Sequence, residues 1–312
     1  MRDPDFSAAQ AAVLDLHGIT AEERWVEAPV VQGQAHVLVI GEGAPVVVLN
    51  GIGVPAAMFA PLMARLDDVT LYAVDLPAFG LTDTTPDFAD DLRTNAVRFL
   101  TEVLDGLGLD RPIVIANSLG SLWASWLALD RPDRVAALAH IGCPAIVLDT
   151  AAPLPMRLLS ARPLGRIMLK VQPPSERQVE KLARMVHQHP LPPEIARLVL
   201  ATERLDHFQG TFLAELNRLL RLRGNRPELA LTADQLANIQ APTLLVFGTD
   251  DPMGDATVGH RMAAAMADAD LHVVPGGHTP WIHHAEQITA LVSALIEQAS
   301  RPARADNEAT GP

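Results

Sequence analysis

The chain has 312 residues, of which 49% are hydrophobic and 20% are charged, and its formal net charge is −13. This length and composition are typical of a folded globular protein with one large or two modest domains, and they exclude a mostly disordered chain. The acidic balance argues against a nucleic-acid partner, because such a surface repels a polyanion. The single cysteine, Cys143, cannot form an internal disulfide, which fits a reducing compartment.

Neither an export signal nor a membrane span is evident in the sequence. The first residues, Met1 to Asp5, lack the basic-then-apolar order of a signal peptide. No stretch reaches the roughly 18 uninterrupted apolar residues that a spanning helix needs. We therefore expect a soluble, cytoplasmic protein with no membrane partner, and the sequence leaves homo-oligomerisation open.

Short runs rich in valine and isoleucine alternate with longer helical patterns along the chain. This alternation predicts an α/β fold, with a mostly parallel sheet and helices on both of its faces. The predicted strands are Ala35–Ile40, Pro45–Leu49, Thr70–Val74, Pro112–Ala116, Val135–Ile141, Thr243–Phe247 and Leu271–Val274. The predicted helices outside the interval described next are Asp91–Leu107, Leu119–Leu129, Ala256–Met266 and Glu286–Gln298.

One interval, residues 145–230, shows prolines and helical patterns but no strand-like run. We therefore predict a core formed by residues 1–144 and 231–300, an inserted helical segment at 145–230, and a disordered tail at 301–312. The inserted segment carries 13 basic and 8 acidic residues, against the acidic trend of the chain. The favoured interpretation is that these charges form solvated faces and bonds to the acidic core; the alternative is an attraction for anionic substrates.

The most informative motif surrounds Ser118. A buried strand runs into this serine and a helix follows it directly, while the small residues Ala116 and Gly120 stand two places before and after it. A sharp strand-to-helix turn holds its central residue in a strained conformation and has room only for small neighbours. Such a turn projects the serine hydroxyl out of the sheet. It also places the N–H of Leu119 at a helix start, where an oxyanion is stabilised.

These features resemble the α/β-hydrolase family, whose nucleophile elbow reads Gly-x-Ser-x-Gly, with Ala116 at the first glycine position here. A serine nucleophile needs a base that an acid orients, and in this family they follow in the order serine, acid, histidine. The turn after Thr243–Phe247 resembles the family's Gly-x-x-Asp turn, which assigns the acid to Asp251. The segment after Leu271–Val274 resembles its Gly-His segment, which assigns the base to His278.

Two further loops extend the resemblance. The segment Leu49–Gly53 resembles the family's His-Gly-x loop, with Asn50 in the histidine position, and this assigns a second oxyanion donor to the N–H of Ile52, beside that of Leu119. The segment Asp75–Gly80 resembles the Asp-x-x-Gly-x-Gly loop, which we expect to be structural. The inserted helical segment falls where the family places its cap.

The resemblance implies a serine hydrolase that cleaves a carboxylic ester or lactone of an apolar small molecule through an acyl-enzyme, without a cofactor or a metal. The predicted substrate-binding residues are Trp123, Trp281 and Met156. A carbon–carbon bond hydrolase of the same fold is the first alternative, because those enzymes often have asparagine before the serine, as Asn117 here. Against it, Thr279 stands where they usually have tryptophan. A non-catalytic ligand-binding protein is the second alternative, and the complete triad argues against it.

Overall fold

The computed structural model describes residues 3–301, and of Arg162 only the backbone. Eight strands form one sheet in the order β1-β2-β4-β3-β5-β6-β9-β10. Their bounds are β1 (Glu22–Ala28), β2 (Gly33–Ile40), β3 (Ala44–Leu49), β4 (Val69–Val74), β5 (Ile113–Ala116), β6 (Ala137–Ile141), β9 (Thr243–Gly248) and β10 (Ala269–Val274). β2 pairs antiparallel with β1 and β4, and every other neighbouring pair in this sheet is parallel.

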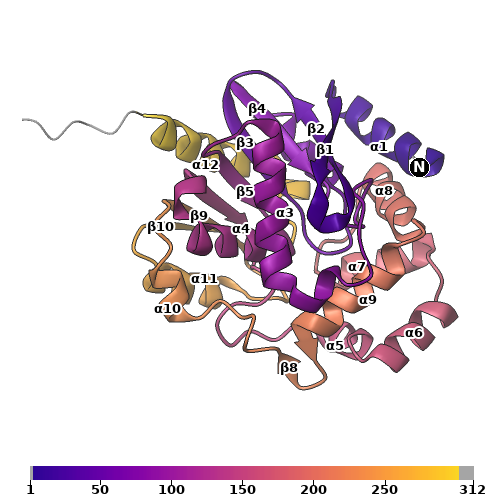
Figure 1. Cartoon of the computed structure of the whole chain (residues 1–312). Coiled ribbons are helices and arrows are strands. Elements are labelled where there is room, and N and C mark those ends of the chain that lie inside the picture. Colours follow the sequence, from indigo (N-terminus) through magenta and orange to yellow (C-terminus); the bar gives the residue numbers. More distant parts are fainter. Residues whose placement is uncertain (1–2, 302–312) are drawn as a thin grey trace, which may run out of the picture.

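Helices cover both faces of this sheet (Figure 1). Helices α3 and α4 pack together, as do α2 and α12, and Figure 1 shows α3 in front of the sheet while α12 runs behind it. The helices are α1 (Pro4–Leu16), α2 (Ala60–Met63), α3 (Leu92–Leu107), α4 (Leu119–Asp130), α5 (Leu154–Leu159), α6 (Arg162–Val171), α7 (Glu176–Met185), α8 (Pro193–Glu203), α9 (Phe208–Leu219), α10 (Ala233–Ala237), α11 (Ala256–Ala265) and α12 (Trp281–Ser300).

The predicted fold class is confirmed. The central strands β3, β5, β6 and β9 are buried on both faces, which is why they read as continuous apolar runs in the sequence. Strand β1 was not predicted. It lies at the edge of the sheet, and its residues Glu22 to Arg24 are exposed, so its sequence lacks the apolar run of a buried strand.

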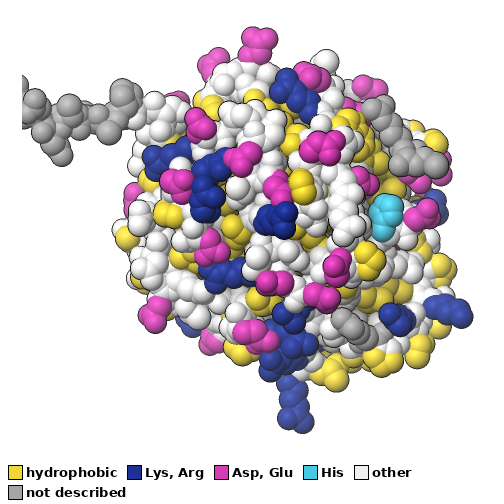
Figure 2. All heavy atoms as spheres, in the orientation of Figure 1, with side chains coloured by type: hydrophobic (Ala, Val, Ile, Leu, Met, Phe, Trp, Pro, Cys, Tyr) yellow, Lys and Arg dark blue, Asp and Glu magenta, His cyan; other side chains and the backbone are white. Residues whose placement is uncertain are grey.

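Residues 145–230 form helices α5 to α9, which lie along the right side and lower right in Figure 1, with α8 beside α1. The short helix α10 follows them before β9. The interval also contains a two-residue ladder, β7 (Leu220–Arg221) with β8 (Gly224–Asn225), which belongs to a separate sheet. A single parallel bridge, Val147 to Leu231, joins the two ends of the interval. Figure 2 shows Lys and Arg side chains in this region and also over the core, interspersed with Asp and Glu side chains across the visible face. The predicted tail lies outside the described residues except for Arg301.

The loop after β4 is held by a buried carboxylate, that of Asp75. It accepts hydrogen bonds from His36 Nδ1 at 2.8 Å, from the Ala56 N–H at 2.8 Å and from the Leu81 N–H at 3.0 Å. Both His36 and Asp75 are fully buried. This carboxylate therefore ties β2, the segment after β3 and the loop after β4 into one unit, in agreement with the structural role expected for this loop.

Replacing Asp75 with alanine should lower the free energy of unfolding by about 3–5 kcal/mol, because three buried donors lose their acceptor at once. Urea denaturation measures this change. Asp83→Ala is the matched control, since within residues 3–301 this exposed carboxylate accepts only the Gln34 N–H, and its loss should cost about 1 kcal/mol. Equal losses for the two variants would contradict the structural role of Asp75.

Candidate active site

Ser118 lies in the turn between β5 and α4, in a backbone conformation that residues other than glycine rarely adopt. Its φ is 53° and its ψ is −111°, so the predicted backbone strain is present. The turn is tight: a Cβ at Gly120 would lie 2.6 Å from the Leu49 carbonyl oxygen, so only glycine fits there. Ala116 is accommodated as a fully buried residue at the end of β5. The local sequence therefore builds the tight, strained strand-to-helix turn that the predicted nucleophile elbow requires.

Two backbone N–H groups beside Ser118 have no acceptor within the described part of the chain, namely those of Ile52 and Leu119. Leu119 is the first residue of α4, so its N–H lies at the positive end of the helix dipole. The loop that carries Ile52 is close to the serine, because a Cβ at Gly51 would lie 3.1 Å from Ser118 Cβ. Free donors of this kind are suited to an oxyanion.

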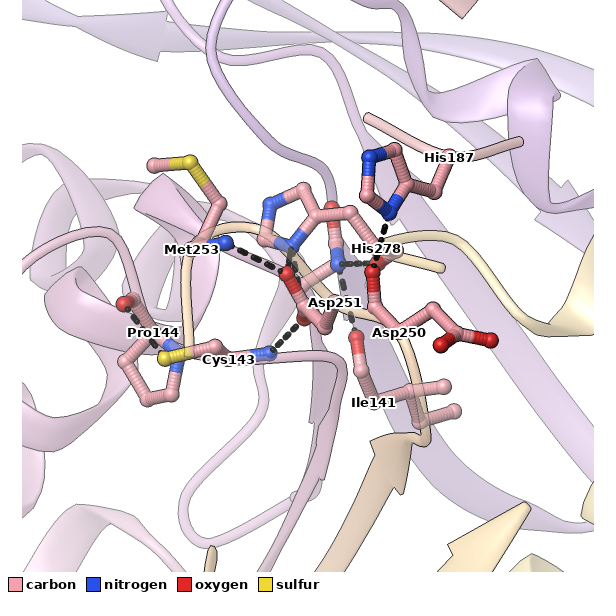
Figure 3. A network of polar contacts seen from close by, with 9 residues as sticks. Ile141, Cys143, Pro144, His187, Asp250, Asp251, Met253 and His278 are labelled. Atoms are coloured by element: carbon pink, nitrogen blue, oxygen red, sulfur yellow. Dashed lines mark hydrogen bonds and ion pairs between the residues drawn. The ribbon is translucent and has the colours of Figure 1, made fainter. Parts of the chain in front are cut away.

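His278 and Asp251 are brought together after β10 and β9. His278 Nδ1 donates to Asp251, at 3.0 Å from Oδ1 and 2.9 Å from Oδ2. The Asp251 carboxylate also accepts the N–H of Met253 at 2.8 Å and of Cys143 at 2.9 Å (Figure 3). These contacts fix a buried carboxylate against the imidazole. A proton on Nδ1 leaves Nε2 free to accept another proton, as a general base requires.

The other two candidate acids lie elsewhere. The Asp250 side chain is exposed, accepts a hydrogen bond from the Thr249 hydroxyl at 3.0 Å, and points away from His278 in Figure 3. Asp149 is exposed as well and forms an ion pair with Arg261 at 2.5 Å. Among the three acids compared in this way, Asp251 is the one bonded to His278.

The main chain of His278 is anchored on both sides. Its carbonyl oxygen accepts from Asn117 Nδ2 at 3.0 Å, and the same amide donates to the Ile141 carbonyl at 2.7 Å. Its N–H donates to the Val186 carbonyl at 3.0 Å, at the end of α7. Asn117 thus positions the histidine loop, a role that the sequence analysis did not assign, although the residue precedes the serine directly.

A cavity of about 320 Å³ lies between the sheet and the helical segment 145–230, and Ser118 and His278 both line it. Its other lining residues are mainly apolar. Glu203 and Lys181 are the two with charged side chains among the described lining residues. The remaining basic residues of the segment lie outside this lining, so they give little support to the idea that its charge attracts anions into the cavity.

Of the predicted substrate-binding residues, Met156 lines the cavity and the two tryptophans do not. Trp281 is fully buried, stacks on Phe59 with a centroid separation of 4.1 Å, and donates to the Met58 carbonyl. Trp123 is fully buried against Phe88 and Phe99. Both indoles therefore pack in the core behind the site. The sequence did not distinguish this place from the cavity wall, because the apolar residues around a tryptophan are the same in both cases.

No group of three or more His, Cys, Asp or Glu residues suited to a metal ion occurs within residues 3–301. Over the same range, no helix has the length and apolar character needed to cross a bilayer. The buried His140 shares a hydrogen bond with the Ser125 hydroxyl, as expected for a core histidine, and burial lowers its pKa to about 4.

Comparisons with known proteins agree with this geometry. Residues 44–285 match the family model of the alpha/beta hydrolase fold. A 2-hydroxy-6-oxononadienedioate/2-hydroxy-6-oxononatrienedioate hydrolase of Pseudomonas putida is 30% identical, covering 85% of this chain and 92% of the relative. The pimeloyl-[acyl-carrier protein] methyl ester esterase of Shewanella oneidensis is 26% identical, covering 84% and 95%. The structure of carboxylesterase CesB from Bacillus subtilis superposes with a TM-score of 0.73 at 20% identity, covering 93% and 96%.

The chain therefore belongs to the alpha/beta hydrolase family, and it is an enzyme of the hydrolase class. The relatives named above include both a hydrolase named for a dienedioate and an esterase. They therefore do not determine which bond this enzyme cleaves, and that question is argued from the site.

Proposed function

We propose that this protein is a serine hydrolase that cleaves a carboxylic ester or lactone of an apolar small molecule. The observation that carries the proposal is the shared location of Ser118, a histidine bonded to a buried carboxylate and the free N–H of Ile52 at the wall of a mainly apolar cavity, with the free N–H of Leu119 directly after Ser118. This set contains a nucleophile, a base and an oxyanion site, which acyl transfer requires.

In the proposed mechanism the Ser118 hydroxyl oxygen attacks the substrate carbonyl while His278 Nε2 accepts the hydroxyl proton. Asp251 holds the imidazole and stabilises its charged form. The N–H groups of Ile52 and Leu119 bind the oxyanion of the tetrahedral intermediate. His278 then gives the proton to the leaving alcohol, and a water molecule, activated by the same base, hydrolyses the acyl-enzyme.

We further propose that the helical segment 145–230 acts as a cap over this site. Met156, Leu159 and Met168 line the cavity from one side, while Gly51 to Val54 line it from the other. A mainly apolar enclosure of this kind favours substrates with apolar groups near the reacting carbonyl.

Carbon–carbon bond hydrolysis is the second candidate, and the Pseudomonas putida relative favours it. That relative's substrate name denotes two carboxylate groups. Among the described lining residues, the exposed Lys181 has the one cationic side chain, and Glu203 lines the same cavity. Burying a carboxylate without a partner is costly, so this lining fits a doubly anionic substrate poorly.

A direct comparison of substrates tests the proposal. We expect kcat/KM for p-nitrophenyl butyrate to exceed that for a 2-hydroxy-6-oxo-dienedioate by about 100-fold or more, because the second carboxylate would lose hydration without gaining a partner. Nitrophenol release and loss of dienolate absorbance measure the two rates, and Ser118→Ala protein gives the background. A faster reaction with the dienedioate would instead support the carbon–carbon bond hydrolase.

A further inference from the structure

A carboxyl group without a partner lies in the wall of the cavity. Glu203 is the last residue of α8, only 8% of its surface is exposed, and it lines the same cavity as Ser118 and His278. Val199, one turn earlier on α8, lines the cavity as well, so this face of the helix points into it. Within the described part of the chain, the Glu203 carboxylate makes no hydrogen bond or ion pair.

The charges around Glu203 do not neutralise it. Helices α1, α7 and α9 pack against α8, and among their described charged residues only Lys181 of α7 lines the cavity. Lys181 is exposed, so its long side chain can keep the ammonium group in water. Burial raises the pKa of Glu203 to about 7, so the carboxylate form is available near neutral pH. A buried carboxylate in this state is stabilised by any cation that enters the cavity.

Two phenylalanines that follow Glu203 in the sequence line the same cavity. Phe208 and Phe212 begin the next helix, both line the cavity, and their rings stack with a centroid separation of 5.4 Å. Phe212 also lies close to the loop of Ile52, because a Cβ at Gly53 would be 3.2 Å from its ring. Aromatic faces attract cations, and most strongly where water is excluded.

We propose that Glu203, Phe208 and Phe212 form a subsite for an ammonium group carried by the substrate. The inference rests on the proposed ester hydrolysis and modifies its substrate class: the ester has apolar groups near the reacting carbonyl and also carries one small organic ammonium group. That ammonium group forms with the Glu203 carboxylate the ion pair that the described part of the chain does not supply. The two rings contact the methyl or methylene groups next to the nitrogen, and the carboxylate disfavours anionic groups at the same position.

Two pairs of esters test this subsite, and the two members of each pair differ in a single atom, nitrogen in one and carbon in the other. Butyrylcholine is compared with its uncharged isostere, in which carbon replaces nitrogen, to probe the alcohol side of the ester. The p-nitrophenyl ester of γ-butyrobetaine is compared with the corresponding isostere to probe the acyl side. In wild-type protein at pH 8, we expect kcat/KM for the cationic member to exceed that of its isostere by about tenfold or more in at least one pair.

The ratio of kcat/KM for the cationic ester to kcat/KM for its uncharged isostere is then measured in two glutamate variants. Glu203→Gln should bring it close to one, because the amide keeps the shape of the side chain but removes the charge. Glu215→Gln is the matched control: Glu215 lies on α9, is fully buried and does not line the cavity. It should keep the wild-type ratio. A ratio near one in wild-type protein for both pairs, or a ratio unchanged in Glu203→Gln, would overturn the subsite.

Binding without turnover separates this inference from the proposed function. Isothermal titration calorimetry with hexyltrimethylammonium should give a Kd about tenfold weaker for Glu203→Gln than for wild type. If hexyltrimethylammonium binding depends on Glu203 but no ester is hydrolysed, the subsite is supported and the esterase function is rejected. If esters are hydrolysed but wild type and Glu203→Gln have equal Kd values, the esterase function is supported and the subsite is rejected. If Glu203→Gln does not fold, Phe208→Leu serves instead, since removal of the ring should also weaken hexyltrimethylammonium binding; an unchanged Kd would reject the subsite.

Discussion

Replacing Ser118 with alanine is expected to lower kcat by about 10³-fold or more, because the substitution removes the attacking oxygen. The fold should survive, since alanine is no larger than serine and the Ser118 side chain donates no hydrogen bond within the described residues. Steady-state kinetics on p-nitrophenyl butyrate measures the loss, and thermal unfolding checks the fold. Activity within tenfold of wild type would remove Ser118 from the role of nucleophile.

Labelling with a fluorophosphonate provides an independent control for this prediction. The reagent forms a covalent bond only with an activated serine, so wild-type protein should be labelled and the Ser118→Ala variant should not. Ser121→Ala is a matched control, because this buried serine follows three residues later on α4 and does not line the cavity. Absence of labelling in wild-type protein would favour a ligand-binding protein without turnover.

Replacing Asp251 with asparagine is expected to lower kcat by roughly 10²- to 10⁴-fold. The asparagine amide would donate to His278 Nδ1, and the imidazole would then carry its proton on Nε2, where it cannot act as a base. The carboxylate is also the acceptor for the N–H groups of Met253 and Cys143, so the variant should lose stability as well. Measuring kcat and the unfolding midpoint together separates the two effects.

Two other aspartates provide the comparison for this prediction. Asp250→Asn and Asp149→Asn should change kcat by less than about threefold, because both side chains are exposed and neither contacts His278. Asp149→Asn removes the charge that pairs with Arg261, a solvent-exposed contact whose loss should change stability little. A larger loss of kcat at either position than at Asp251 would contradict the assignment of the acid.

The fold could be predicted from the sequence because its central strands are buried on both faces. Their valine and isoleucine runs stand out from the polar turns, and the motifs around Ser118 and Asp251 follow two of these strands. The His278 motif follows the edge strand β10, which is only partly buried. The edge strand β1 and the helix α1 were missed for different reasons. β1 is half exposed and charged, whereas α1 does carry a start signal, Asp3 before Pro4, which the sequence analysis did not use.

The wall of the cavity was less predictable than the reacting groups. Trp123 and Trp281 lie close to the site in sequence, but apolar patterns do not distinguish a side chain that packs the core from one that faces a cavity. Glu203 was missed for a different reason, because its residue type predicts exposure. A glutamate in a helix usually lies at the surface, whereas Glu203 is buried in a helix against which α1, α7 and α9 pack. Such positions depend on contacts between distant segments, which no local pattern encodes.

The hydrogen bond from His278 to the Val186 carbonyl has a mechanical consequence. It attaches the loop of the proposed base to the end of α7, and His187 adds a second attachment through its ring nitrogen to the Asp250 carbonyl. Displacing this end of α7 would also displace the main chain of His278 and, with it, the imidazole. We therefore expect Val186 and His187 to stay fixed in any movement of the helical segment that leaves the base in place, while the more distant helices α5 and α6 are free of this restraint. Amide hydrogen exchange at His278 would then be slow even when α5 and α6 exchange rapidly.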